Sequence, residues 1–393
     1  MNPGGRKRSC GRNTPALPGR CAFDTGHFPD KPIHPEGCDT IKPDPDDIHL
    51  IMKRASIPVI FILLVTVLVG SCSSGVSPKH ATQTAAAQMT LAVSAPTPSP
   101  LGSQANPLRM GYVSDPADAQ SLKDGRQMAA LLGDTTAYSI ELAPQASYAD
   151  LIIALSEGRL HLIWLPPITS LATQKLGLAN AALIVNHYGV YAYGTQFLAN
   201  VTLEATSYFD PVSNTNTADV VTALGQFAGL RPCWVEPESA SGYIVPAGIL
   251  SQVGVITQPA VWSQTQTAVI RSLYVGGVCD FGATFAISGD PRTASDVLND
   301  LPDVMSVVKV IWRSDAIIPN LSLSVSPAVD EKMARKLSDA FMEFDQQPDT
   351  LTLLSSMLAY DIQGLRPITN SYFDALRSYL DTLQIDPNNL IGK

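Results

Sequence analysis

Apolar positions from Leu108 onward alternate between short runs of strand length and longer segments with helical spacing. The expected strands are 108–113, 138–142, 160–165, 182–185 and 191–198. The expected helices among them are 117–132, 148–157 and 170–176. This alternation predicts parallel or mixed sheets with helices on both faces. In such sheets ligands bind beyond the carboxyl ends of the strands.

The alternation restarts after a loop at 200–219 that is rich in Asn, Thr and Ser. Further strands are expected at 233–235, 278–281 and 307–311. Further helices are expected at 220–227, 242–252, 266–274, 330–344, 351–357 and 370–383.

Two such sheets joined by two chain crossings would form a two-lobed α/β fold with a hinge and an interlobe cleft. We expect the crossings near residues 196–199 and 283–287. The expected boundaries are 106–197 for the first part of lobe 1 and 198–283 for lobe 2. Residues 284–393 would then form the second part of lobe 1 and the C-terminal helices.

Residues 52–71 have the pattern of a secretory signal peptide. A basic start is followed by an almost wholly apolar run at 57–69 and by small residues before Cys72. This ending resembles the lipobox of bacterial lipoproteins, which implies that Cys72 is lipidated and becomes the N-terminus. The alternative is a single membrane-spanning helix, but the apolar run is shorter than the roughly 20 residues that a span requires. We therefore expect an extracytoplasmic chain that is anchored to a bacterial cell membrane by lipid.

A signal peptide begins a protein, so residues 1–51 are expected to be a mis-assigned extension, with Met52 as the true start. The alternative is a small zinc-binding or disordered tail. The cysteines of this segment, Cys10, Cys21 and Cys38, lack the paired Cys-x-x-Cys spacing of a zinc module.

Residues 72–105 are rich in Ser, Thr, Ala, Pro and Gln and are expected to form a disordered tether, because they cannot bury enough apolar surface to fold. Residues 1–71 hold nine of the 26 Lys and Arg residues and seven of the 35 Asp and Glu residues, so the remainder carries a net charge of −11. An acidic chain without a basic patch excludes nucleic acid as a partner.

Residues 234–246 carry the clearest candidate chemistry. Ser239 and Ser241 follow a turn at Glu236-Pro237 and bracket the start of an expected helix. The first N–H groups of a helix have no partner in the helix, and the helix dipole is positive there. Two serines add hydroxyl donors, so this turn can bind a small tetrahedral anion without Lys or Arg. The alternative is a plain serine N-cap.

The chain resembles the substrate-binding proteins of bacterial ABC importers, in particular the phosphate/phosphite/phosphonate-binding family with its periplasmic-binding-protein-like fold. The resemblance covers roughly residues 108–345. The segments that carry it are 148–167, Tyr193-Gly-Thr-Gln-Phe, Glu236-Pro-Glu-Ser-Ala-Ser-Gly-Tyr, Cys279-Asp-Phe-Gly-Ala-Thr and Val310 to Asn320 with its Ile-Pro-Asn ending.

The resemblance implies an anion cradle made of the Ser239 and Ser241 hydroxyls and the backbone N–H groups of Ser241, Gly242 and Tyr243. Gly242 would let the anion approach the bare backbone. Ala240 stands where the family usually has Thr, which removes one donor, at a cost of about 1–3 kcal/mol if nothing replaces it. Strict phosphonate or phosphite specificity is therefore not implied.

Asp280 matches the family's acidic residue at the cleft, where it would accept a bond from a protonated ligand oxygen or an amine. The alternative is a strand-end Asp that caps the next turn. The family often has a His upstream, and here Gln264 or Gln266 would replace it. Candidate aromatic residues of the cleft, each of which could equally be core, are Tyr112, Trp164, Tyr191 and Tyr193.

Isolated His161 and His187 are expected to be structural. No histidine pair has metal-ligand spacing after the signal, so neither a metal nor another cofactor is expected. Cys233 and Cys279 could form a disulfide in an exported protein or remain as buried thiols.

The sequence lacks a Gly-x-Ser-x-Gly elbow, a Walker loop and a His-Glu-x-x-His motif, so it does not indicate an enzyme. We expect a monomeric solute-binding lipoprotein that delivers a small oxyanion to an ABC permease and its ATPase. The alternatives are a ligand-sensing lipoprotein that feeds a receptor and an exported hydrolase that uses Ser239 or Ser241 with Asp280. Neighbouring permease and ATPase genes would favour import over sensing, and the hydrolase lacks a His base.

Overall fold

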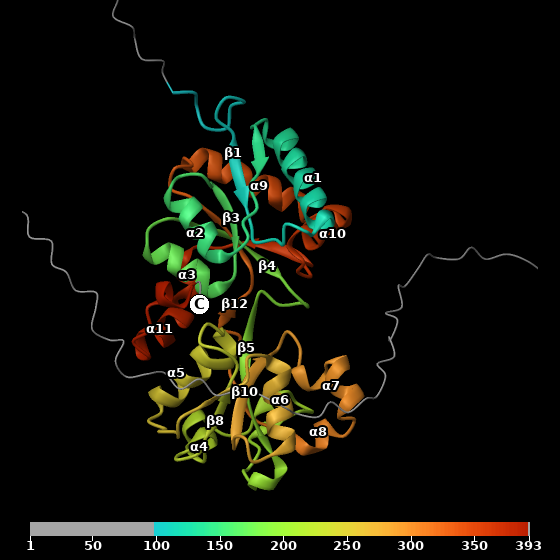
Figure 1. Cartoon of the computed structure of the whole chain (residues 1–393), viewed down its shortest axis with the longest axis vertical. Helices are drawn as coiled ribbons and strands as arrows, with labels where there is room; N and C mark the ends of the chain where they lie inside the picture. Colours follow the sequence, from blue (N-terminus) through green and yellow to red (C-terminus); the bar gives the residue numbers. More distant parts are fainter. Residues whose placement is uncertain (1–97, 392–393) are drawn as a thin grey trace, which may run out of the picture. The chain divides into compact units, whose positions relative to one another are not determined.

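The computed structural model describes residues 98–391, which belong to one compact unit (Figure 1). The expected extension, signal peptide, Cys72 and the tether as far as residue 97 lie outside the described residues. Residues 98–105, expected in the tether, belong to the fold: Leu101 packs against the first core, and Gly102 N donates to Asn106 O at 2.8 Å. The average composition of residues 72–105 is polar, so it did not indicate that Leu101 packs against the core.

The first lobe contains a six-stranded mixed sheet in the order β14-β4-β13-β3-β1-β2. Its strands are β1 (Leu108–Gly111), β2 (Ile140–Leu142), β3 (Leu162–Leu165), β4 (Asn180–Asn186), β13 (Ser322–Val325) and β14 (Gly364–Pro367). β1, β2 and β3 are parallel, whereas β13 runs antiparallel to β3 and β4, and β14 runs antiparallel to β4.

Helices cover both faces of this sheet, as the unbroken apolar pattern of β3 requires. Leu162 and Trp164 belong to one core, which includes residues of α1 (Ala119–Thr136), α9 (Glu331–Phe344) and α10 (Pro348–Leu358). Ile163 and Leu165 point to the other face and belong to a core with residues of α2 (Tyr148–Ser156). α3 (Pro167–Lys175) contacts β4 and β13.

The second lobe is built on a sheet in the order β11-β5-β10-β8-β9, with β12 paired to β5. Its strands are β5 (Ala192–Asn200), β8 (Pro232–Trp234), β9 (Val261–Trp262), β10 (Phe281–Ala286), β11 (Val308–Arg313) and β12 (Ile318–Pro319). Its helices are α4 (Val220–Gly225), α5 (Val245–Gln252), α6 (Gln266–Val275), α7 (Ser295–Asp300) and α8 (Val304–Val307). A small hairpin pairs β6 (Phe209–Asp210) with β7 (Thr215–Asn216).

The two lobes confirm the expected α/β class with two mixed sheets, but both crossings lie elsewhere than predicted. The first is the turn between β4 and β5, and the second joins β12 to β13 near residue 320. Residues 284–319 therefore stay in the second lobe, and the boundary at 283 was wrong. The polar residues after Ala286 end a strand without changing sheets, because β5 pairs with β10 on one side and with β11 and β12 on the other.

Of the two alternatives for Cys233 and Cys279, the structure has the disulfide, with Cα atoms 5.7 Å apart. It joins β8 to the segment that enters β10, its parallel neighbour. Among residues 98–391, no helix is both long and apolar enough to cross a membrane.

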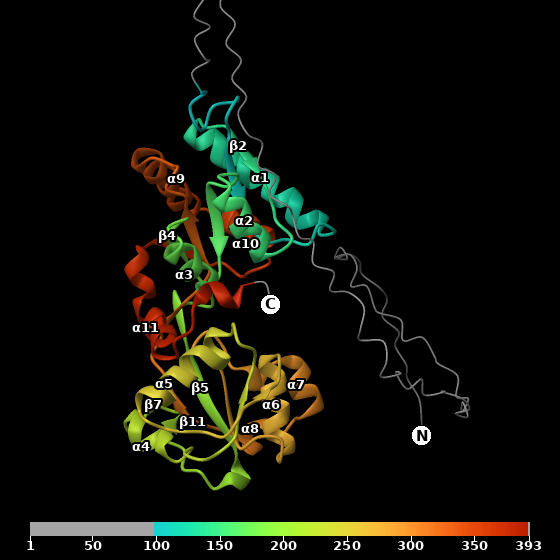
Figure 2. The ribbon, with the colours of Figure 1, turned by 60° about the vertical axis from the view of Figure 1, so that its left-hand side comes forward.

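The last described segment, residues 374–391, contacts both lobes and is called the C-terminal bridge below. It consists of α11 (Asp374–Thr382) and the 3-10 turn η5 (Pro387–Leu390), preceded by the 3-10 turn η4 (Asn370–Phe373). α11 lies beside α5 of the second lobe in both views (Figures 1 and 2), and η5 contacts α3 of the first lobe. The α5–α11 contact is close, since a Cβ on Gly248 would lie 2.6 Å from Cδ1 of Tyr379.

Candidate ligand-binding cleft

A cavity of about 880 Å³ is lined by residues of both lobes. The first lobe contributes Val113, after β1, together with the starts of α2 and α3 at residues 146–149 and 166–169. These positions follow the carboxyl ends of strands, as expected for an α/β sheet. The second lobe contributes residues 238–241, Gln266 and residues near the end of β10.

The serine turn, residues 239–244, is the second lobe's main contribution. Ser239 caps a short π-helical turn, η2 (Ala240–Ile244): its Oγ accepts from Gly242 N at 3.1 Å, and its carbonyl accepts from Tyr243 N at 3.1 Å. The amides of Gly242 and Tyr243 therefore donate to Ser239 within the turn. The prediction that they bind the anion was wrong. The first amides of the turn, those of Ala240 and Ser241, have no acceptor in the helical ladder.

Gly242 is required by packing and not by close approach of an anion, because it does not line the cavity. A Cβ at this position would lie 2.2 Å from Val235 Cγ2 and 2.8 Å from Ser239 Oγ. The absence of a side chain lets the turn lie against Val235, directly after β8, and brings Ser239 to the cavity.

Ser241 is 3% exposed and is fixed from two sides. Its carbonyl accepts from Thr195 Oγ1 at 2.7 Å, and its Oγ accepts from Gln266 Nε2 at 3.4 Å. Gln266, and not Gln264, therefore takes the place proposed for the missing histidine. Burial raises the pKa of Tyr193 to about 12, against the opposing effect of its hydrogen bond to Ser241. Tyr193 lines the cavity as expected and stays neutral, so its hydroxyl can donate.

The opposite wall begins with the starts of α2 and α3, two expected helices whose place at the cleft the sequence interpretation did not identify. α3 has Pro166 as its N-cap, without a side-chain cap bond, and Pro167 as its first residue, which lacks an N–H. The next amides, those of Ile168 and Thr169, have no acceptor within the helix. At α2, Ser147 Oγ accepts from Asp150 N at 3.1 Å. The signals were the Pro-Pro pair directly after the apolar run that ends at Leu165 and the Ser-x-x-Asp pattern at residues 147–150.

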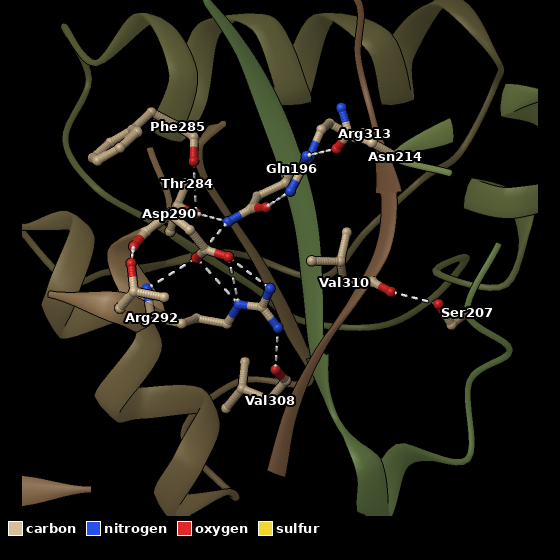
Figure 3. Close-up of polar contacts among 11 residues, drawn as sticks. Gln196, Ser207, Asn214, Thr284, Phe285, Asp290, Arg292, Val308, Val310 and Arg313 are labelled. Atoms are coloured by element: carbon tan, nitrogen blue, oxygen red, sulfur yellow. Dashed lines mark hydrogen bonds and ion pairs between the residues drawn. The ribbon is translucent and has the colours of Figure 1, made fainter. Parts of the chain in front are cut away.

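A buried ion pair fixes the loop that leads away from β10 (Figure 3). Arg292 Nη2 lies 2.6 Å from Asp290 Oδ2, and the same carboxylate accepts from Gln196 Nε2 at 3.0 Å. Gln196 in turn accepts from Arg313 Nη2 at 3.0 Å. Burial alone would raise the pKa of Asp290, but the hydrogen bonds and charge of Arg292 outweigh burial and hold that pKa below its usual range. Asp290 lines the cavity with its charge already balanced.

Besides Gly242, five expected residues are not brought to the cavity: Tyr112, Trp164, Tyr191, Tyr243 and Asp280. Tyr112 and Trp164 are each 1% exposed in the first core, where the Tyr112 hydroxyl donates to Ser121 O and Trp164 packs edge-on against Phe341. Tyr243 points to the other side of the serine turn and packs against Trp234 and Trp262.

Asp280 is also misplaced in the sequence interpretation. Its Oδ2 accepts from Arg231 N at 2.7 Å, so it ties the entry of β10 to the entry of β8 and does not cap the next turn, which was the alternative. β10 runs antiparallel to β5, with Phe281 opposite Ala199 and Ala286 opposite Gly194. The start of β10, next to Asp280, is therefore the end farther from the cleft.

The first crossing supplies cavity residues that the sequence did not identify. His187 bonds through Nδ1 to Asp361 O at 2.7 Å and stacks on Tyr360, with 4.1 Å between the ring centroids. Both residues line the cavity, as does Tyr188. Tyr191 is covered instead by the Arg366 guanidinium. His161 has the expected structural role, because its Nδ1 accepts from Arg109 N at 3.0 Å.

This fold and cleft define a class of two-lobed proteins that hold a solute between their lobes. A family model described as "ABC transporter, phosphonate, periplasmic substrate-binding protein" matches residues 110–373. The chain belongs to this family, whose members are extracytoplasmic binding components of transporters and not enzymes.

The phosphate-import protein PhnD of Mycolicibacterium smegmatis is 22% identical over 271 residues, which cover 64% of this chain and 78% of that protein. The structure of XAC2383 from Xanthomonas citri bound to chloride ion has a TM-score of 0.53 at 15% identity and covers 70% of this chain and 97% of that one. The same protein bound to ATP has a TM-score of 0.52. These structural similarities show the fold.

Proposed function

We propose that this chain captures a phosphonate- or phosphate-type oxyanion in the cleft and delivers it to an ABC permease. The observation that carries the proposal is the convergence of two helix starts, one from each lobe, on one cavity. Ala240 and Ser241 face it from the second lobe, and Ile168 and Thr169 from the first. Unpartnered N–H groups at the positive ends of helices bind tetrahedral anions.

Hydroxyl groups complete the donor set. Ser239, Ser241 and Thr169 line the cavity, and none of its lining residues is Lys or Arg among residues 98–391. Ser239 Oγ accepts from Gly242 N, which leaves its own proton free to donate to a ligand. The serine thus caps the turn and binds the anion at the same time, so the two interpretations of this serine are compatible.

Calorimetric titration with phosphate, phosphite and methylphosphonate tests the proposal. Replacing Ser241 by Ala removes one donor, and we expect the affinity for the best anion to fall by about 1–3 kcal/mol. Ser251→Ala is the matched control, because Ser251 is exposed on α5 and lies outside the cavity. Unchanged affinity in Ser241→Ala, or no binding of any of the three anions to the unaltered chain, would contradict the proposal.

Both lobes provide donors, so we propose that the lobes close on the ligand about the two crossings. Small-angle scattering should show a smaller radius of gyration at saturating anion. An unchanged radius would exclude closure.

We further propose that the mature chain begins at Cys72, which carries the lipid anchor. The basic, apolar and small-residue pattern of residues 52–71 supports this. Intact mass of the membrane fraction should show a lipid adduct on a chain without residues 1–71. A soluble chain that begins at Met1 would contradict it.

A further inference from the structure

The cavity is much larger than its anion-binding donors require. With the lobes as they stand, before the closure proposed above, its volume of about 880 Å³ lies in the range that encloses a drug-sized organic molecule. The donors of the two helix starts occupy only part of its wall. Much of the remainder is apolar or aromatic and includes Tyr148, Phe285, Tyr360, Leu390 and Ile391.

We infer that the ligand of this chain carries, beside its oxyanion, an apolar organic group about as large as an aromatic ring. This inference rests on the proposed function and names the class of its ligand: substituted phosphonates or phosphate monoesters. The apolar group would pack on a wall formed in part by Leu390 and Ile391 of the C-terminal bridge.

That wall is held in place by contacts with the first lobe. Asp386 pairs with Lys175 of α3 at 2.9 Å, and the Asp386 carboxylate also accepts from Asn388 N at 3.0 Å. Leu390 is 8% exposed and belongs to the same core as Ile168 and Leu171 of α3. The C-terminal bridge is thus fixed beside the start of α3, which would hold the anion.

The family model ends at residue 373, so the C-terminal bridge lies outside the matched region. The wall at Leu390 and Ile391 is therefore supplied by a part of the chain beyond the segment that identifies the family. A ligand that contacts this wall must carry an organic group in addition to the anion that the serine turn and the start of α3 would bind.

The charges of the cavity favour an apolar substituent over a second anionic group. The acidic residues that line it are Glu238 and Asp290, and the Asp290 charge is balanced by Arg292. No Lys or Arg of the described chain lines the cavity to bind a second phosphoryl group. Apolar groups gain affinity from burial alone, roughly fourfold per methylene equivalent.

The test is a calorimetric series on the full chain with phosphate, methylphosphonate and phenylphosphonate. We expect phenylphosphonate to bind at least about tenfold more tightly than methylphosphonate, since the ring buries several carbon atoms. If phosphate or methylphosphonate binds as tightly as phenylphosphonate, the inference is overturned and the proposed function stands. If none of the three binds, the proposed function fails and the inference fails with it.

Variants of the bridge locate the contact. Leu390→Ala should lower phenylphosphonate affinity several-fold more than methylphosphonate affinity. Leu383→Ala is the matched control, because Leu383 packs in the same core but does not line the cavity. Ile391→Ala, at a half-buried position, gives the same test if Leu390→Ala does not fold. An unchanged ratio of the two affinities in a folded variant would overturn the assignment of the wall.

Discussion

Gly242→Ala tests whether the serine turn depends on its contact with Val235, directly after β8. The added Cβ would lie 2.2 Å from Cγ2 and 2.6 Å from Cβ of Val235, well inside any real carbon–carbon contact. Val235 is itself 4% exposed in the second lobe, so it has little room to move. The clash must therefore be relieved by displacing the turn, which carries Ser239 and Ser241.

The expected cost follows from this geometry. Overpacking a core by one methyl group costs typically about 1–3 kcal/mol. Because the nearest atoms belong to a buried side chain, we expect the upper end, about 3 kcal/mol. At about 2 °C per kcal/mol for a chain of this size, the melting temperature should fall by about 6 °C. Displacement of the two serines should also weaken anion binding by at least about tenfold.

Thermal unfolding and calorimetric titration on the same preparation measure both effects. Gly225→Ala is the matched control, because Gly225 ends α4 with no atom within 4 Å of an added Cβ. That change should be neutral or stabilising by up to about 1 kcal/mol. A Gly242→Ala chain that keeps both its melting temperature and its anion affinity would refute the role given to this contact.

Three further predictions concern stability and the corrected site. Replacing Cys233 and Cys279 together by Ala opens a loop of sequence separation 46 and should cost about 4 kcal/mol in denaturant titrations; a cost near zero would contradict this. The Asp290 pKa is lowered in the folded chain, so its stabilising contribution is complete above the unfolded pKa of about 3.9 and is lost as the pH falls through the folded pKa. Asp290→Asn should cost about 3 kcal/mol of folding stability at pH 7, because it leaves Arg292 unpaired. It should also reduce the loss of stability at acid pH in a stability–pH curve. If that loss is unaltered, the ion pair is not its source. Asp280→Asn keeps an oxygen acceptor for Arg231 N and should leave anion affinity unchanged by titration; weaker binding would restore Asp280 to the site.

The sequence predicted four of the first lobe's six strands, β1 to β4, because each is an apolar run bounded by turns, but it predicted no strand at β13 or β14. β3, for example, lies within the expected 160–165. An unbroken apolar run does not show which of its aromatic residues line the cavity and which lie in the core. A strand buried on both faces gives Trp164 the same apolar surroundings in the sequence whether it faces a ligand or a helix, and the structure places it against Phe341.

The failures at Asp280 and at the second crossing have a common physical cause. Strand direction and partner choice are set by long-range pairing, which leaves no local mark in the sequence. Only the antiparallel register of β10 with β5 shows that Asp280 lies at the end of β10 opposite to Ala286. The serine turn was found because its capping chemistry is local. The start of α3, which faces the serine turn across the cleft, could be identified only by knowing which strand ends meet there.

The C-terminal bridge has a consequence for how the molecule unfolds. One apolar core includes Leu171 of the first lobe, Phe281 of the second and Leu376 of α11, so the two lobes share buried surface as well as covalent crossings. Regions that share a core tend to unfold as one cooperative unit. We therefore expect a single thermal transition in place of two lobe-by-lobe transitions, and calorimetric and van't Hoff enthalpies that agree. A chain ending at residue 373 would lose this coupling, and its lobes would melt separately.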